Sequence, residues 1–305
     1  MWIMWITSCY TLQKGCIHKK TIKSYPQNVD KSVQKEKNMG YKMIFSDMDG
    51  TLLKNDIEVS EKNKIAIEKA VKKGVQFVIC TGRGVFGVER YLKQLNLIGQ
   101  EGYAICQNGG AVYDLKDMSL ALRESFSPKI YAPIAEYARK LGLELYYYDD
   151  RKFIAETETA RVKRYCEVMG SAVKIMKEPL IYDGEFTKSL ITGDREKLLL
   201  VQKMVQDIAG NQLECFFSSK VFMEVVKKGV SKGNIMEETA RKAGVPMKSV
   251  IAVGDSDNDI SMIKKAGLGI AVANADPEVK EIADYVTKNR CEQDAIAEII
   301  EKFIL

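Results

Sequence analysis

The chain has 305 residues, of which 46% are hydrophobic and 29% are charged. These values are typical of a globular protein with one or two domains, and they exclude a disordered or fibrous chain. The formal net charge of +5 comes from residues 1–38, because basic and acidic residues are equal in number after that point. The residues after 38 carry no net charge and give no sign of a basic surface for nucleic acid, so we expect a small-molecule enzyme.

Cysteine and histidine usage narrows the chemistry. Seven cysteines are scattered without a C-x-x-C pair, which argues against disulfides or a zinc site and favours a reducing, cytoplasmic location. The only histidine, His18, lies within residues 1–38. A catalytic site in the remaining residues must therefore use carboxylates, lysine, threonine, backbone amides or a hard cation. No apolar run approaches the ~20 residues of a membrane span, so no membrane partner is expected. The sequence carries no signal for the oligomeric state.

Residues 1–38 are predicted to be a disordered N-terminal extension. The segment begins with an apolar stretch of about six residues, shorter than the ~7–15 of a secretory signal, and no positive charge precedes it. It holds seven lysines and only two acidic residues, unlike the sequence that follows. We therefore expect the fold to begin at Met39.

Strands and helices alternate over the first part of the chain after residue 38. Apolar runs and helical periodicity predict strand, helix, strand, helix and strand at 41–46, 61–73, 75–80, 85–95 and 103–106. Ser60 is the expected N-cap of the first helix, and Gly74 is expected to end it. Strands that are apolar throughout are typical of a parallel sheet with both faces covered.

The alternation resumes towards the end of the chain. Strands are predicted at 249–255 and 268–274, and helices at 231–244, 257–267, 276–287 and 291–305. Asp276 is the expected N-cap of its helix, with Pro277 at the first position. These segments predict an α/β fold with a doubly wound parallel sheet, in a core domain formed by residues 39–121 and 226–305.

Residues 122–225 follow a different pattern. Helices are predicted at 127–142 and 195–210, and strands at 144–150, 152–156, 186–193, 212–219 and 220–226. Helices beside antiparallel strands indicate a separate α+β unit. We expect an inserted cap domain over these residues.

Three short polar motifs follow strands of the predicted parallel sheet: DMDGT (47–51), TGR (81–83) and GDSDND (254–259). Ligands of open α/β sheets bind beyond the carboxyl ends of the strands, so the motifs are expected at one edge. A fourth segment, GVSKGN (229–234), sets Lys232 at the start of a helix. Each motif alone fits ordinary turn chemistry or a surface lysine. Their occurrence together, in this order, indicates a site.

This series of motifs is similar to the four motifs of the haloacid dehalogenase (HAD) superfamily of phosphotransferases. The large insert, and the segment NGGAVYD (108–114), resemble the Cof-type branch of cytoplasmic Mg²⁺-dependent phosphatases. The resemblance covers residues 42–305 and implies a Rossmann-like core with an α/β cap that closes over the site. It also implies hydrolysis of small phosphorylated metabolites, sugar phosphates above all, through an aspartyl-phosphate intermediate.

The resemblance assigns roles to the acidic residues and the lysine. Asp47 would be the nucleophile, and Asp49 the general acid and base. Mg²⁺ would be held by Asp47, the backbone carbonyl of Asp49 and Asp255, with Asp259 either supporting the ion or holding Lys232. Lys232 would supply positive charge to nucleophile and phosphate together.

Further groups are expected to bind the phosphate oxygens: the amides at Met48 and Asp49, the Thr81 side chain, the Gly82 amide and Asn258. For Arg83, a packing ion pair and a contact with substrate are equally open, and Asp257 is expected only to shape its loop. The tyrosines at 146–148 are expected to pack on a core, and the basic run at 161–164 is expected to face solvent. No cap residue is therefore assigned to the substrate.

Other functions fit parts of the pattern. A phosphomutase would use the same motifs and return the phosphoryl group to a second hydroxyl. A phosphoacceptor receiver domain also gathers aspartates and a lysine at a sheet edge, but it is much shorter and needs no inserted unit. A non-catalytic phosphometabolite-binding protein is disfavoured, because every catalytic position holds a residue that can perform its chemical step. The substrate stays open, with pyridoxal phosphate and flavin mononucleotide after sugar phosphates.

Overall fold

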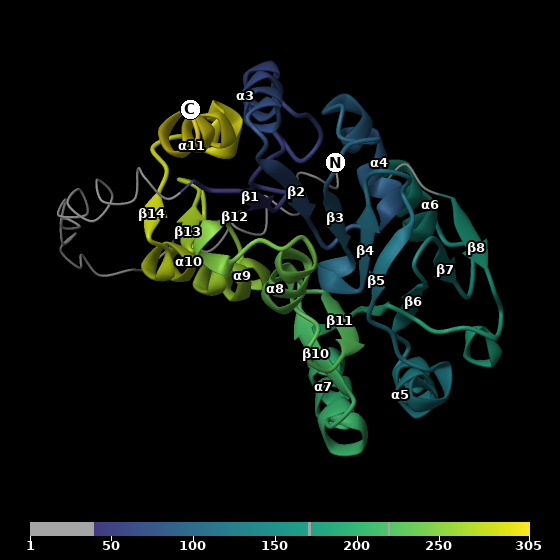
Figure 1. The fold of residues 1–305 in the computed structure, drawn as a ribbon. Helices are drawn as coiled ribbons and strands as arrows, with labels where there is room; N and C mark the ends of the chain where they lie inside the picture. The colour runs from purple at the N-terminus through teal and green to yellow at the C-terminus, as the bar shows by residue number, and fades with distance from the viewer. Residues whose placement is uncertain (1–39, 170–171, 219) are drawn as a thin grey trace, which may run out of the picture. The chain divides into compact units, whose positions relative to one another are not determined.

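The computed structural model of the chain describes residues 40–169, 172–218 and 220–305 (Figure 1). The extension predicted for residues 1–38 lies outside the described residues. Two β-sheets form in the described part, and apolar clusters pack against both. No helix in that part is long and apolar enough to cross a membrane.

The larger sheet has eight strands in the order β14–β13–β12–β1–β2–β3–β4–β5. Six are parallel: β1 (Met43–Ser46), β2 (Gln76–Cys80), β3 (Tyr103–Cys106), β12 (Val250–Gly254), β13 (Leu268–Ala271) and β14 (Tyr285–Val286). The predicted doubly wound parallel sheet is confirmed. The two antiparallel strands at its edge, β4 (Ala111–Asp114) and β5 (Leu120–Arg123), are not predicted from the sequence. Each is a short strand that forms by antiparallel pairing, β4 with β3 and β5 with β4.

Helices cover both faces of this sheet (Figure 1). Ile44 of β1 points to one face, in an apolar cluster with α3 (Glu61–Lys72), α4 (Val85–Gln94) and α11 (Ala295–Phe303). Phe45 points to the other face, in a cluster with α8 (Lys232–Lys242) and with Met262 of α9 (Ile260–Lys265). Because successive strand residues face opposite sides and both sides are covered, the neighbouring positions 44 and 45 are both apolar.

The strand order reverses at the centre of this sheet. From β1 the chain continues to β2 and β3 on one side, whereas β12, β13 and β14 lie on the other side. β1 and β12 are parallel neighbours, with Ser46 beside Val253. The residues that follow these two strands therefore lie next to each other at the point where open α/β sheets bind their ligands.

The smaller sheet has six strands in the order β10–β11–β9–β6–β7–β8. They are β6 (Glu144–Tyr148), β7 (Phe153–Ala155), β8 (Val173–Ile175), β9 (Lys188–Thr192), β10 (Leu213–Phe217) and β11 (Phe222–Lys227). One face packs against α5 (Pro128–Lys140) and α7 (Arg195–Ala209). Val162 of α6 (Ala160–Met169) packs against the other face. These elements match the predicted α+β insert, apart from α6 and β8. The division into core and cap domains at residues 122 and 225 stays a prediction.

Two helix predictions near the C-terminus are wrong in extent. The helix predicted at 276–287 ends early as α10 (Pro277–Ile282), and β14 follows, because aromatic and β-branched residues there pair with β13. Asp276 occupies the N-cap position, but its side chain accepts no capping hydrogen bond. The last helix begins only at Ala295, because Asp294 has a left-handed φ of 68°. Short 3₁₀ helices are η1 (Gln107–Gly109), η2 (Pro179–Ile181), η3 (Met247–Ser249), η4 (Asp257–Asp259) and η5 (Cys291–Gln293).

Candidate active site

The loop after β1 carries the first motif. Asp47 continues the strand, since its N–H donates to the carbonyl of Val253 in β12 at 3.0 Å. The chain then turns around the carbonyl of Met48, which accepts from several following amides. Gly50 has a φ of +74°, and a Cβ there would lie 2.6 Å from Asp255 Oδ2. The turn therefore needs glycine both for its backbone and for the close approach of the β12 loop.

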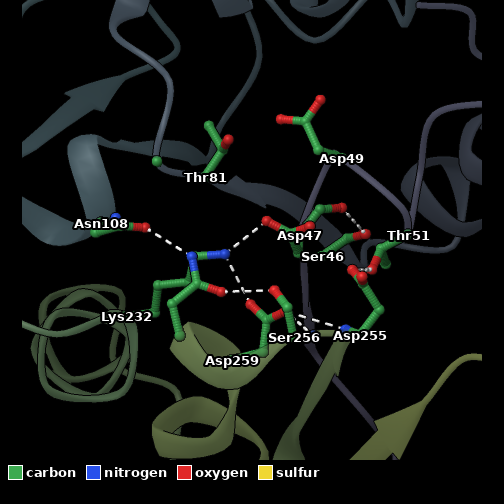
Figure 2. Close-up of polar contacts among 12 residues, drawn as sticks. Ser46, Asp47, Asp49, Thr51, Thr81, Asn108, Lys232, Asp255, Ser256 and Asp259 are labelled. Atoms are coloured by element: carbon green, nitrogen blue, oxygen red, sulfur yellow. Dashed lines mark hydrogen bonds and ion pairs between the residues drawn. The ribbon is translucent and has the colours of Figure 1, made fainter. Parts of the chain in front are cut away.

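Three carboxylates meet at this edge of the sheet. Ligand oxygens of Asp47, Asp255 and Asp259 lie within 4.8 Å of one another (Figure 2). Asp255 Oδ1 accepts from the Thr51 hydroxyl at 2.6 Å. Asp259 Oδ2 accepts from the backbone N–H groups of Asp255 and Ser256, at 3.0 and 3.1 Å. The structure thus brings together the three carboxylates named as metal-binding candidates, from two loops far apart in sequence. The fourth predicted ligand is the backbone carbonyl of Asp49.

Lys232 is buried beside this cluster, with 1% of its surface exposed. It begins α8, whose N-cap Ser231 accepts from the backbone of the first turn. Its Nζ lies 2.5 Å from Asp47 Oδ1 and 2.7 Å from Asp259 Oδ1 (Figure 2). Burial alone would lower the pKa of Lys232, but the carboxylates of Asp259 and Asp47 hold it above its usual value. The ammonium is therefore charged, and Asp259 holds it.

The cluster carries more negative than positive charge. Burial, with Asp259 and Asp255 nearby, raises the pKa of Asp47 well above its usual range even though Lys232 opposes the shift. Burial likewise raises the pKa of Asp255 to about 7, and Asp259 adds to it. Among the described residues, Asp47 Oδ2 and Asp255 Oδ2 accept no hydrogen bond. The free Asp255 oxygen and the excess negative charge of the three carboxylates fit a hard divalent cation such as Mg²⁺.

Asp49 has a different partner. Arg83 donates from Nε to Asp49 Oδ2 at 2.9 Å and from Nη2 to Asp49 Oδ1, and Nη2 also reaches the carbonyl of Asp56 at 2.9 Å. Arg83 is 5% exposed at its side chain, whereas Asp49 is 44% exposed. The Asp49 carboxylate points away from the Lys232 cluster in Figure 2. Of the two options open for Arg83, the structure thus contains the ion pair, formed with a predicted catalytic residue.

Apart from Lys232, the predicted phosphate-binding groups lie in the loops after β1, β2 and β12. Thr81 Oγ1 accepts from the Arg83 N–H at 3.2 Å, which leaves the hydroxyl proton available for another acceptor. The Met48 side chain is buried in the core, so only its backbone faces the site's chemistry. Asn258 donates from Nδ2 to Asn108 Oδ1 at 3.1 Å. The predicted roles of these groups stay predictions.

The sequence predicts no role for four polar residues near the site: Thr51, Asn108, Lys188 and Glu224. Thr51 lies in DMDGT and Asn108 in NGGAVYD, but neither motif assigns these two residues a role. Lys188 and Glu224 are single polar residues in the apolar strands β9 and β11, and nothing local distinguishes them. The basic run in α6 has ordinary partners, such as Glu144 for Arg161, in line with the predicted solvent-facing role.

Comparison with known proteins defines the class. Residues 44–300 match the haloacid dehalogenase-like hydrolase family. The chain therefore belongs to this family of hydrolases, as the four motifs and the Cof-type resemblance predict.

Individual relatives are similar over their whole length. YxeH of Bacillus subtilis is 30% identical over 87% of this chain and 99% of its own. The 5-amino-6-(5-phospho-D-ribitylamino)uracil phosphatase YcsE of the same organism is 31% identical, over 90% of this chain and 100% of its own. A solved haloacid dehalogenase-like hydrolase from Bacteroides thetaiotaomicron superposes with a TM-score of 0.79 at 29% identity, covering 86% of this chain and 99% of that one.

Proposed function

We propose that this protein is a Mg²⁺-dependent phosphatase that hydrolyses small phosphate monoesters, sugar phosphates above all, through an aspartyl-phosphate at Asp47. The observation that carries the proposal is the buried contact of Asp47 with Lys232 beside Asp255, at the switch point of the sheet. The name of the relative YcsE, a phosphatase of a phosphorylated ribityl compound, supports a phosphate ester as the substrate.

Asp47 is the nucleophile in this proposal. Lys232 holds Oδ1, so Oδ2 is free to attack phosphorus. The bond from phosphorus to the leaving oxygen breaks as the new bond to Asp47 forms. Asp49 enters this step as the protonated acid and gives the leaving oxygen its proton. A water then attacks phosphorus and loses a proton to the Asp49 carboxylate, while the bond from phosphorus to Asp47 breaks. Phosphate leaves, the Asp47 carboxylate is restored and Asp49 is protonated again. Arg83 orients the Asp49 carboxylate through its two hydrogen bonds.

The metal-binding groups would be the Asp47 carboxylate, the Asp49 backbone carbonyl and Asp255, with Asp259 nearby. A bound Mg²⁺ supplies positive charge that lets a carboxylate approach an anionic phosphoryl group. The contacts of Asp259 with Lys232 and two backbone amides favour a holding role, and direct ligation by Asp259 stays a prediction.

The phosphate oxygens would be bound by Lys232, the Thr81 hydroxyl, the Gly82 amide, Asn258 and the loop amides at Met48 and Asp49. We also propose a reducing, cytoplasmic location. The thiols of Cys80, Cys106, Cys215 and Cys291 are free, which suits such a compartment.

The test is phosphate release from a panel of sugar phosphates and other phosphorylated metabolites, with Mg²⁺ and after chelation. We expect release from several esters only when Mg²⁺ is present. Absence of release from every ester would contradict the proposal, and transfer to a second hydroxyl without release would identify a phosphomutase.

A further inference from the structure

The smaller sheet carries a buried ion pair beside the loops of the candidate site. Lys188 of β9 and Glu224 of β11 are 3% and 6% exposed, and Nζ and Oε2 are 3.2 Å apart. Glu224 pairs in register with Leu190, so it lies diagonally across from Lys188 on the same face of the sheet. Burying two charges costs hydration that their attraction only partly restores, so stability alone is a weak reason for the pair.

Lys188 contacts the second motif. Its Nζ donates to the carbonyl oxygen of Gly82 at 3.0 Å and lies 4.7 Å from the ring centroid of Tyr148. Tyr148 in turn stacks on Phe86 of α4, with centroids 6.4 Å apart. The ammonium therefore has a fixed place, and it fixes the peptide between Gly82 and Arg83 in the middle of TGR.

Glu224 acts on the GDSDND motif (254–259) through two amides. Its Oε2 also accepts from Asn108 Nδ2 at 3.0 Å, and Asn108 Oδ1 accepts from Asn258 Nδ2 at 3.1 Å. An ionised carboxylate can only accept hydrogen bonds, so it turns the Asn108 NH₂ towards itself and the Asn108 oxygen towards Asn258. That oxygen turns the Asn258 NH₂, while the Asn258 oxygen accepts from the Ser256 hydroxyl at 2.9 Å. One charge thus sets the direction of both amides.

We propose that Lys188 and Glu224 are positioning residues for the phosphate-binding groups. Lys188 holds the TGR peptide, and Glu224 holds the Asn258 amide through Asn108, so the smaller sheet organises phosphate binding on the larger one. This inference rests on the proposed phosphatase function. It makes anion affinity, as well as turnover, depend on two side chains that touch no reacting atom.

The decisive variant is Glu224→Gln, which keeps the shape and removes the charge that directs the amides. The readouts are the inhibition constants of orthovanadate and inorganic phosphate against p-nitrophenyl phosphate turnover, and the thermal shift that each anion produces. We expect both inhibition constants to rise about tenfold, as for a lost hydrogen bond to a charged group. Inhibition constants do not depend on the fraction of active enzyme, so a purely structural role would leave them unchanged.

A matched control is Glu156→Gln, at the residue that follows β7 of the same sheet. Glu156 accepts from Arg139 of α5 and from Tyr147, on the face that packs against that helix. It loses the same charge without a contact to the motif loops, so its inhibition constants should equal those of the wild type.

Lys188→Met combined with Glu224→Met guards against misfolding of the single variant. Buried ion pairs replaced by apolar residues commonly keep their stability, so this variant should fold while anion affinity falls as before. Unchanged inhibition constants in either folded variant would overturn the inference. A wild type without turnover would contradict the proposed function instead, and the anion thermal shifts would still compare the variants.

Discussion

Asp47 and Asp49 are separated by one residue, yet their carboxylates have different neighbours. Asp47 is buried against Lys232, whereas Asp49 is partly exposed and paired with Arg83. This separation is the physical basis for two roles in one reaction. The resemblance implies Lys232 beside Asp47, whereas the Arg83 partner of Asp49 follows only from the adjacency of the loops after β1 and β2.

Asp49→Asn should separate metal binding from turnover. The backbone carbonyl survives the change, while the proton-carrying group is lost, so we expect kcat to fall by about 10²–10⁴-fold. Stabilisation of the protein by Mg²⁺, followed by thermal denaturation, should persist. Loss of that stabilisation together with turnover would argue against the division of roles.

Arg83→Lys should lower kcat by about tenfold, because a lysine cannot bind Asp49 through two parallel hydrogen bonds. Steady-state kinetics with p-nitrophenyl phosphate measure the effect. Arg161→Lys is the control, since Arg161 pairs with Glu144 in the smaller sheet. Equal kinetics for the two variants would mean that Arg83 only packs the loop.

At the scale of elements, the turn after β1 is the most constrained segment of the site. Gly50→Ala places a Cβ against Asp255 Oδ2 in a left-handed backbone, so the carboxylate must move. Gly74→Ala is the matched control, because Gly74 has a φ of +82° and nothing within 4 Å of a Cβ. We expect both variants to lose about 1–2 kcal/mol in urea denaturation, and only Gly50→Ala to lose turnover. Full activity of Gly50→Ala would refute this account of the turn.

The elements next to the motifs follow from local sequence. β1, β2, β12 and α3 match their predictions because continuous apolar runs and the Ser60 cap act locally. The prediction fails where pairing decides the outcome. β14 forms because β13 offers it an edge, and β5 forms against β4 although half of its side chains are exposed.

At the scale of the whole molecule, the sequence predicts the motifs of the larger sheet but not the contribution of the smaller sheet to the site. Lys188 and Glu224 meet Gly82 and Asn108 only through the tertiary fold, with more than a hundred residues between partners in each contact. No periodicity or motif marks such pairs. This is why the sequence assigns no insert residue to the site.

Every residue of the proposed site lies between Asp47 and Asp259. Removal of residues 1–38 should therefore leave kcat and the melting temperature unchanged. Purified full-length and shortened chains can be compared directly by phosphate release and thermal denaturation. An inactive shortened chain would show that the segment is needed for the fold.

The most direct test of the central claim is Mg²⁺-dependent turnover of p-nitrophenyl phosphate by the wild type and by Asp47→Asn. We predict turnover by the wild type that stops on chelation, and a fall of at least ~10³-fold in kcat for a folded Asp47→Asn protein. Turnover by Asp47→Asn at the wild-type rate, or none by either protein on any phosphate ester, would contradict the claim.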